Sequence, residues 1–345
     1  MKKWTITLLM LMVALTAAGC ASKDTAATAT PTATKSADGK TNYEGLTLKL
    51  GVQGKGGLYG KARQEKWYEQ AFEKLGVKVE WAEFQSGPPM TEAMASDKLD
   101  FASLGNMPVI AAQAAGIQFE IISQILEGKQ NTAIIVPANS TLKDIKDLKG
   151  KKVAVTKGSN AYNLLTRGLH DAGIEASEVQ IIQLQPNEAQ PAFDSGKVDA
   201  WATWDPYISI NTLTGKGKVL AEGESLGVLA PSFVIVRKEI ADKYPELVTT
   251  YLSVLEKSQE WEEQNSAEAT KKYAADYKIP EAIVEGMLKR SKSVNIPVSQ
   301  EIVTELQKTA DFQKSIGTIR KQIQVSEVVN NKFIEEALKS TSSSK

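Results

Sequence analysis

Short strand-like runs alternate with helical patterns along this chain, and this alternation constrains its fold more than any other feature. It begins with Leu46–Val52, a helical pattern near Arg63–Leu75 and a second run at Val77–Phe84. A helical pattern near Met90–Asp97 and a run at Asp100–Leu104 follow. Strands that alternate with helices pair in parallel and are covered by those helices. The sequence therefore predicts an α/β fold with a parallel sheet.

The same alternation starts a second time near residue 133, and a return strand is expected at Ser232–Val236. From Ala241 onward the apolar residues are spaced for one buried helical face, so the end of the chain is predicted to be helical. We therefore expect two α/β lobes, with crossings near Asn131–Val136 and Pro231–Val236 that form a hinge over a central ligand cleft. The second series comprises Ala133–Val136, Lys152–Val155, Tyr162–Ala172, Val179–Leu184 and Ala200–Thr203.

The length of the chain agrees with two lobes, because 345 residues exceed what one hydrophobic core ordinarily holds. Residues 133–232 are assigned to lobe 2. Residues 45–132 and 233–345 are assigned to lobe 1, which is therefore discontinuous and carries the C-terminal helices.

The amino terminus resembles a lipoprotein signal peptide. Lys2 and Lys3 precede an apolar stretch, Ile6–Ala18, that is too short to span a membrane as a mature helix. Small residues then lead to Cys20, the only cysteine. Removal of residues 1–19 would leave Cys20 to carry a lipid anchor, on the outer face of the cytoplasmic membrane or in the periplasm. The alternative is an ordinary secretory signal with an incidental cysteine.

Polar, low-complexity segments are expected at both ends of the mature chain. Residues 20–44 are rich in Ala, Thr, Ser, Lys and Asp and have almost nothing to bury, so they are predicted to form a disordered linker. Ser340–Lys345 is similarly polar and is expected to be frayed.

The composition limits the ligand and the chemistry. Lys plus Arg and Asp plus Glu each total 41, so the formal net charge is zero and no overall field attracts nucleic acid. An anion therefore has to be held by local groups. The one histidine, His170, is placed on the polar side of a helix with Asn163 and Arg167. One histidine and one cysteine offer too little for a catalytic set or a metal site, so we expect a binding protein without a cofactor and not an enzyme.

Ligands bind open α/β sheets where strands end and helices begin, and five such junctions carry unusual sequence. The first is Gln53 with the glycine-rich run after it, whose amides suit an anion but whose spacing fits neither nucleotide-binding motif. The second is Gly87 and Pro88 at the start of a helix. The alternative at the first junction is a flexible turn. The alternative at the second is that the proline only marks the start of the helix.

Gly105 and Asn106 form the third junction, and Ser159 and Asn160 form the fourth. Asn106 and Ser159 are suited to cap the helices that start there. Capping and ligand binding are compatible, because the free amides of a helix amino terminus point at whatever occupies the cleft. We therefore favour both roles for Ser159, which makes a donor-rich pocket with Lys157, Asn160 and the helix dipole.

The fifth junction places Trp204, Asp205 and Tyr207 at the end of a strand. The two aromatic side chains are candidates for a wall that holds the apolar part of a ligand. The alternatives are core or interlobe packing for the aromatic residues and a helix cap for Asp205.

These segments together resemble the aliphatic sulfonate-binding proteins of ABC importers, within the wider nitrate, sulfonate and taurine family. The resemblance extends over roughly Leu46–Lys321. It implies a type II periplasmic-binding-protein fold with the ligand between the lobes, and a membrane permease with a cytoplasmic ATPase as partners. The segments that carry it are Glu83–Pro88, Ala112–Gly116, Lys157–Ser159, Asn163–Leu165 and Val198–Tyr207.

The expected ligand is an aliphatic sulfonate, either an alkanesulfonate or taurine, that a monomeric protein captures for sulfur uptake. A sulfonate offers only acceptor oxygens, which amides and hydroxyls can satisfy. The alternatives are nitrate, a thiamine-pyrimidine-like ligand, a receptor in place of the permease, and a fold-related biosynthetic enzyme. The predicted ligand-binding residues are Gln53, Gly87, Pro88, Gly105, Asn106, Ser159, Asn160, Trp204, Asp205 and Tyr207.

Overall fold

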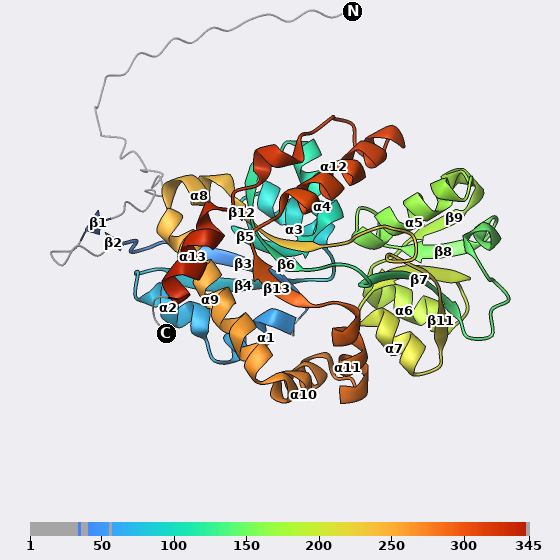
Figure 1. Cartoon of the computed structure of the whole chain (residues 1–345), viewed down its shortest axis with the longest axis horizontal. Coiled ribbons are helices and arrows are strands. Elements are labelled where there is room, and N and C mark those ends of the chain that lie inside the picture. Colours follow the sequence, from blue (N-terminus) through green and yellow to red (C-terminus); the bar gives the residue numbers. More distant parts are fainter. Residues whose placement is uncertain (1–33, 36–40, 55–56, 343–345) are drawn as a thin grey trace, which may run out of the picture.

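The computed structural model of the protein describes residues 34–35, 41–54 and 57–342, and Figure 1 shows two separate sheets, each with helices beside it. The predicted signal peptide, Cys20 and residues 55–56 of the first junction lie outside this part of the chain. Within it, no helix combines the length and the apolar character that a membrane span requires.

The larger sheet has six strands in the order β13-β6-β12-β5-β3-β4. Strand β3 pairs in parallel with β4 and β5, but β12 lies antiparallel between β5 and β6. The prediction of a parallel sheet is wrong for this part, because the chain returns from the smaller sheet and enters β12 in the opposite direction. The strands are β3 (Thr47–Gln53), β4 (Lys78–Phe84), β5 (Phe101–Gly105), β6 (Phe119–Leu126), β12 (Ser232–Arg237) and β13 (Ser293–Ile296).

The smaller sheet has five strands in the order β11-β7-β10-β8-β9. Strand β8 is parallel to β9 and β10, whereas β7 is antiparallel to β10 and β11. This sheet is therefore also mixed. Its strands are β7 (Thr132–Pro137), β8 (Lys152–Val155), β9 (Gln180–Gln183), β10 (Ala200–Trp204) and β11 (Gly217–Glu222). A further short pair, β1 (Thr34–Lys35) and β2 (Thr41–Asn42), precedes both sheets.

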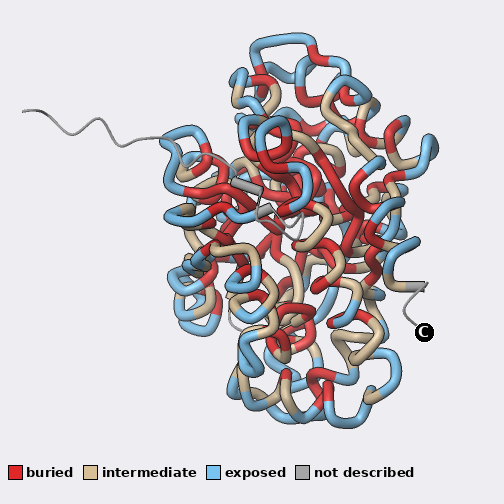
Figure 2. Tube along the Cα trace, turned by 90° about the vertical axis from the view of Figure 1, so that its left-hand side faces the viewer, coloured by how far each residue is buried: buried red, intermediate tan, exposed pale blue. Residues whose placement is uncertain are grey.

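Helices cover both faces of the larger sheet, and β12 shows why such strands are apolar throughout. Phe233 and Ile235 belong to one core, and Val234 and Val236 belong to the core on the other face, since alternate side chains point to opposite faces. Figure 2 shows the buried residues concentrated along these central strands. The covering helices are α3 (Gly87–Ala95), α4 (Asn106–Ala115) and α12 (Gln300–Ser315) on the first core, and α1 (Gly60–Gln64), α2 (Trp67–Glu73), α8 (Lys238–Lys243), α9 (Pro245–Gln264) and α13 (Lys332–Ser342) on the second.

The smaller sheet is also covered on both faces. Helix α5 (Asn160–Asp171) packs on one core, and α6 (Pro186–Asp194) and α7 (Tyr207–Leu213) pack on the other. Helices α10 (Ser266–Tyr277) and α11 (Glu281–Arg290) contact each other, and α11 also contacts α7 of the smaller sheet. The short 3-10 helices are η1 (Gly57–Tyr59), η2 (Ile145–Leu148), η3 (Ala176–Glu178) and η4 (Val325–Val328).

Two backbone crossings join the sheets, at residues 127–131 between β6 and β7 and at residues 223–231 between β11 and β12. They lie just before the predicted positions, because most of the residues expected there belong to β7 and β12. The crossings touch each other, since the amide of Ala230 donates to the carbonyl of Gly128 at 2.8 Å. Gly128 has a φ of +82°, and a Cβ there would lie 2.3 Å from the carbonyl carbon of Ala230.

Most of the predicted linker lies outside the described residues, but Tyr43 and the end of α13 differ from what the sequence predicts there. Tyr43, which falls in the expected linker, is buried and packs edge-on against Tyr244 with ring centroids 5.5 Å apart. Its amide also donates to the carbonyl of Leu75 at 2.8 Å. At the other end, helix α13 continues to Ser342, past the expected start of the frayed tail. Local composition missed both features, because distant segments create the contacts.

Candidate functional site

A cleft of about 510 Å³ lies between the two sheets. Strand ends and helix starts of both sheets line it, as do residues of α10 and α11. Eight of the ten predicted ligand-binding residues are at its surface, namely Gln53, Gly87, Gly105, Ser159, Asn160, Trp204, Asp205 and Tyr207.

The other two predicted residues, Pro88 and Asn106, do not line the cleft. Pro88 lies in the first turn of α3, where its ring approaches Gly158 of the smaller sheet. Asn106 is the first residue of α4 and is buried, with its side-chain amide donating to the carbonyl of Leu229 at 3.4 Å. The expected cap is also different, because Gly105 holds the N-cap position of α4. Both residues lie next to the cleft wall, Asn106 bonded to the crossing at residues 223–231 and Pro88 near the loop that follows β8.

Three helices begin at this cleft: α3, α4 and α5. Ser159 caps α5 as predicted, because its hydroxyl accepts from the amide of Tyr162 at 3.2 Å. Helix amino termini carry partial positive charge and unpaired amides. Their convergence favours an anion in the cleft without a basic side chain.

Asn160 joins the two sheets beneath the cleft. Its side-chain oxygen accepts from the amide of Met107 in α4 at 3.0 Å, and its nitrogen donates to the carbonyl of Ala230 at 3.4 Å. A Cβ on Gly105 would lie 2.2 Å from this side-chain nitrogen. Position 105 therefore requires glycine for the close approach of α4 and α5.

Asp205 lines the cleft, but its carboxylate is already engaged. One oxygen accepts from the amide and hydroxyl of Ser209 at 3.0 and 2.6 Å, and the other accepts from Arg290 of α11 at 3.0 Å. Burial raises the pKa of Asp205, and the bonds from Ser209 and Arg290 oppose that shift. Arg290 also bonds Glu222 at 3.1 Å and the carbonyl of Gln130 at 2.6 Å. Asp205 therefore ties α11 to the smaller sheet, and an acceptor-only carboxylate is a poor contact for an anion.

The acidic residues at the cleft are each paired with a base. Glu83 bonds Arg63 at 2.7 Å, and Asp276 bonds Lys272 at 2.8 Å. Among the lining residues that the structure describes, none is Lys, Arg or His. Neutral donors and backbone amides are therefore the groups that face the cleft most directly.

The cleft has a third wall that the sequence did not predict, formed by α10 and α11. It adds two aromatic rings of α10, Tyr273 and Tyr277, and two apolar side chains of α11, Met287 and Leu288. The four-residue spacing of the tyrosines puts both on one face of a helix, which was the available signal. Together with Trp204 and Tyr207 of the smaller sheet, they give an extended apolar wall.

Glu262 of α9 is partly buried behind this wall and accepts a hydrogen bond from Tyr273. Burial raises the pKa of Glu262 from 4.5 to about 7, the hydrogen bond opposes the shift, and the charge of Glu263 adds to it. The folded protein therefore holds this proton more tightly than the unfolded chain does.

The raised pKa of Glu262 makes the fold less stable as the pH rises. Its contribution to stability is complete below pH 4.5 and is lost as the pH rises through about 7. Glu262→Gln should therefore raise the free energy of unfolding by about 2 kcal/mol at pH 8 and change it little at pH 5. Urea unfolding at both pH values measures this. Glu285→Gln, at an exposed carboxylate of α11, is the control, and equal stabilisation by Glu262→Gln at both pH values would contradict the assignment.

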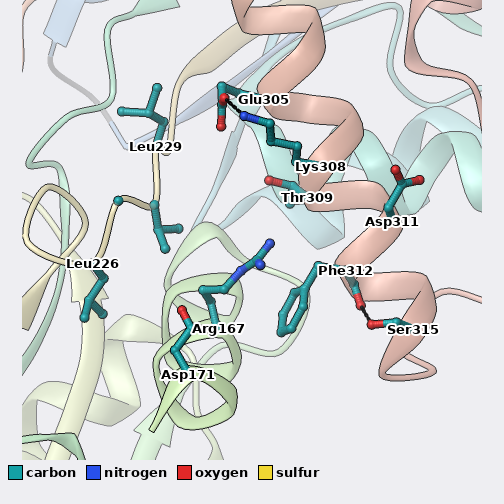
Figure 3. A pocket seen from close by; sticks show the side chains of 12 residues that line it. Arg167, Asp171, Leu226, Leu229, Glu305, Lys308, Thr309, Asp311, Phe312 and Ser315 are labelled. Atoms are coloured by element: carbon teal, nitrogen blue, oxygen red, sulfur yellow. Dashed lines mark hydrogen bonds and ion pairs between the residues drawn. The ribbon is translucent and has the colours of Figure 1, made fainter.

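A second hollow, of about 560 Å³, lies between α5 and α12, and Figure 3 shows Arg167 and Phe312 facing each other across it. The guanidinium of Arg167 lies 3.9 Å from the ring centroid of Phe312. Beside it the buried Gln313 donates to Asn163 at 2.8 Å. Asn163 is therefore buried by α12 and does not lie on the solvated face of α5 that the sequence predicted. The prediction that His170 is exposed is confirmed. None of the ten predicted ligand residues lines this hollow.

The described residues include no group of three or more His, Cys, Asp and Glu side chains that could hold a metal ion.

Sequence and structure comparisons agree on the kind of protein this chain is similar to. The family described as NMT1/THI5 like matches residues 61–269. The putative aliphatic sulfonates-binding protein of Bacillus subtilis is 42% identical over 296 residues, which cover 86% of this chain and 89% of that protein.

Solved structures show the same similarity. The alkanesulfonate-binding protein SsuA from Xanthomonas axonopodis pv. citri, bound to MOPS, matches with a TM-score of 0.77 and 32% identity over 84% of this chain and 99% of that one. The periplasmic aliphatic sulphonate binding protein SsuA from Escherichia coli matches with a TM-score of 0.71 and 30% identity over 82% of this chain and 97% of that one.

Proposed function

Since this chain belongs to the NMT1/THI5-like family, together with the aliphatic sulfonate-binding proteins, we propose that it captures organic sulfonates for an ABC importer. The observation that carries this proposal is the meeting of three helix amino termini at one cleft with an extended apolar wall. This arrangement suits a ligand with an anionic head and an organic tail.

The head-group site is suited to a sulfonate, which is ionised at physiological pH and only accepts hydrogen bonds. Its partners would be backbone amides at the starts of α3 and α5, with the neighbouring Gln53 and Ser103. At the start of α4 the amides of Asn106 and Met107 already donate within the protein. Three polar atoms of the cleft wall have no hydrogen-bond partner among the described residues: Asn131 Oδ1, Thr132 Oγ1 and Ser291 Oγ. Buried polar groups normally find a partner. Both hydroxyls are buried in this structure, so the assignment of the ligand does not depend on them.

The tail site favours an organic sulfonate over a small inorganic anion. Trp204, Tyr207 and Tyr277 line the cleft, and burial of apolar surface contributes roughly 25 cal/mol per Å². Nitrate has no tail to contact these rings. We therefore expect affinity to increase with the length of the alkyl chain until the wall is covered.

Calorimetry of the mature protein tests this function. Alkanesulfonates of increasing chain length and taurine are titrated beside nitrate and a thiamine pyrimidine. Binding of the sulfonates at micromolar or tighter affinity is the expected result, and heat from only nitrate or only the pyrimidine would overturn the assignment. Hydrolysis or rearrangement of the ligand during the titration would instead indicate an enzyme.

Trp204→Ala is expected to weaken binding of a long-chain sulfonate about 10-fold and that of methanesulfonate about 2-fold, because only the longer ligand reaches the ring. Ser159→Ala should weaken both ligands similarly, by loss of the cap at the head-group site. Calorimetry gives the affinities, and thermal unfolding checks that both variants fold. An equal effect of Trp204→Ala on both ligands would remove Trp204 from the tail site.

Beyond the cleft, the proposed function includes a division of the chain into two lobes and a lipid anchor. Residues 45–132 and 233–345 would form lobe 1 and residues 133–232 lobe 2, which the strand membership of the two sheets supports. A lipid on Cys20 would hold a monomeric protein at the membrane, where a permease and its ATPase receive the ligand. Mass spectrometry of the protein extracted from membranes checks the anchor at Cys20.

A further inference from the structure

Three hydroxyl groups form a chain that leads from the core of the larger sheet to the cleft. Tyr251 of α9 donates to the phenol oxygen of Tyr59 at 3.0 Å, and that phenol is hydrogen-bonded to the hydroxyl of Ser103 in β5. Tyr251 is 1% exposed and does not line the cleft, whereas Tyr59 and Ser103 do. The chain therefore ends at the head-group side of the site.

A donor assignment that suits a ligand in the cleft runs outward from the core, from Tyr251 to Tyr59 and from Tyr59 to Ser103. Each hydroxyl carries one proton, and burial raises the pKa of Tyr59 to about 12 and that of Tyr251 well above its ordinary value, so both phenols stay protonated. The proton of Tyr251 lies in its bond to Tyr59. In this assignment Tyr59 donates its own proton to the oxygen of Ser103, in a bond whose geometry allows either oxygen to be the donor.

This leaves the proton of Ser103 free for another acceptor. Ser103 lies on β5 one residue before Leu104 and two before Gly105, the N-cap of α4. Its hydroxyl thus stands beside one of the three helix amino termini that face the cleft. A ligand oxygen held at the amides of α3 or α5 would lie in the same cleft as this hydroxyl.

We propose that Ser103 is a ligand-binding residue whose hydroxyl is fixed as a donor by Tyr59 and Tyr251, two positioning residues that act from the core. This inference rests on the proposed function and deepens it, since a fixed donor suits a head group that only accepts hydrogen bonds, as a sulfonate does. Tyr251 then influences the ligand without touching it.

A double-mutant cycle tests this coupling, with butanesulfonate as the probe and calorimetry as the measurement. Ser103→Ala should weaken binding roughly 10-fold, because it removes a hydrogen bond to a charged group. Tyr251→Phe should weaken binding about 3-fold in the original protein and should have no effect when Ser103 is already alanine. The ring of Tyr251, stacked on Phe101 with centroids 4.4 Å apart, is kept in this variant.

Tyr43→Phe is the matched control. Tyr43 belongs to the same apolar core, and its hydroxyl donates to Glu246 at 3.2 Å, away from the cleft. This variant should lower stability without changing affinity. Thermal unfolding of each variant separates losses of stability from losses of binding.

The outcomes distinguish this inference from the function on which it rests. If the original protein does not bind any sulfonate, the proposed function fails. If it binds butanesulfonate but Tyr251→Phe changes nothing, or changes affinity equally with and without the Ser103 hydroxyl, the coupling alone is overturned.

Discussion

Asn160→Asp is expected to lower the affinity for an alkanesulfonate about 100-fold, which corresponds to about 2.8 kcal/mol. The new side chain has the same shape, and its oxygen can still accept from the amide of Met107. It also places a carboxylate at the start of α5, within the head-group site. Two like charges about 4 Å apart repel by roughly 4 kcal/mol at an effective dielectric constant of 20. Partial protonation of the new carboxyl relieves some of that repulsion.

Calorimetry at pH 8 with butanesulfonate measures this loss, and Asn160→Ala is its matched control. The alanine variant loses the bonds to Met107 and Ala230 but adds no charge, so we expect a loss of about 10-fold. The aspartate variant keeps the bond from Met107 and the alanine variant loses it, so a greater loss in the aspartate variant points to the added charge and not to the lost bond. If the aspartate variant binds as tightly as the alanine variant, the ligand's anionic group does not lie beside Asn160.

Gly128→Ala is expected to lower the free energy of unfolding by about 3 kcal/mol or more. Its φ of +82° is unfavourable for a residue with a side chain. The new Cβ would also lie 2.3 Å from both the carbonyl carbon of Ala230 and the nitrogen of Pro231. These are backbone atoms of the other crossing and cannot rotate away, so the two crossings would have to separate.

Gly150→Ala provides the control for Gly128→Ala. Gly150 has a φ of +75°, but a Cβ there would meet no atom within 4 Å. This variant should therefore lose only about 1 kcal/mol of stability, from the unfavourable backbone conformation. Urea unfolding of both variants measures the two losses. Equal losses would show that the contact between the crossings adds nothing to stability.

Sequence reasoning predicted the elements whose signals are local. The first strand and the helix starts near Gly87, Gly105 and Ser159 follow from strand periodicity and glycine or serine at junctions. The rule that ligands bind at the ends of strands then placed most candidate residues at one cleft. Each of these steps depends on residues close together in the chain.

The features that were missed depend on contacts between distant residues. Strand β13 has four residues in a region that reads as helical, and it forms because β6 offers an edge. Asp205 is predicted as a ligand contact or a helix cap, and it does bond the amide of Ser209 in α7, but the sequence does not reveal that Arg290, 85 positions later, also engages it. The α10–α11 wall was overlooked for the same reason, since the tyrosine spacing alone does not show what the helix faces.

Strand β12 lies between β5 and β6 in the larger sheet, although the whole smaller sheet separates it from them in the chain. As the polypeptide emerges during synthesis or secretion, β5 and β6 appear first and each has an edge that only β12 fills. Open strand edges recruit other chains and promote aggregation. A product that stops before Ser232 thus carries two such edges, whereas the smaller sheet, built from one uninterrupted segment, is already complete.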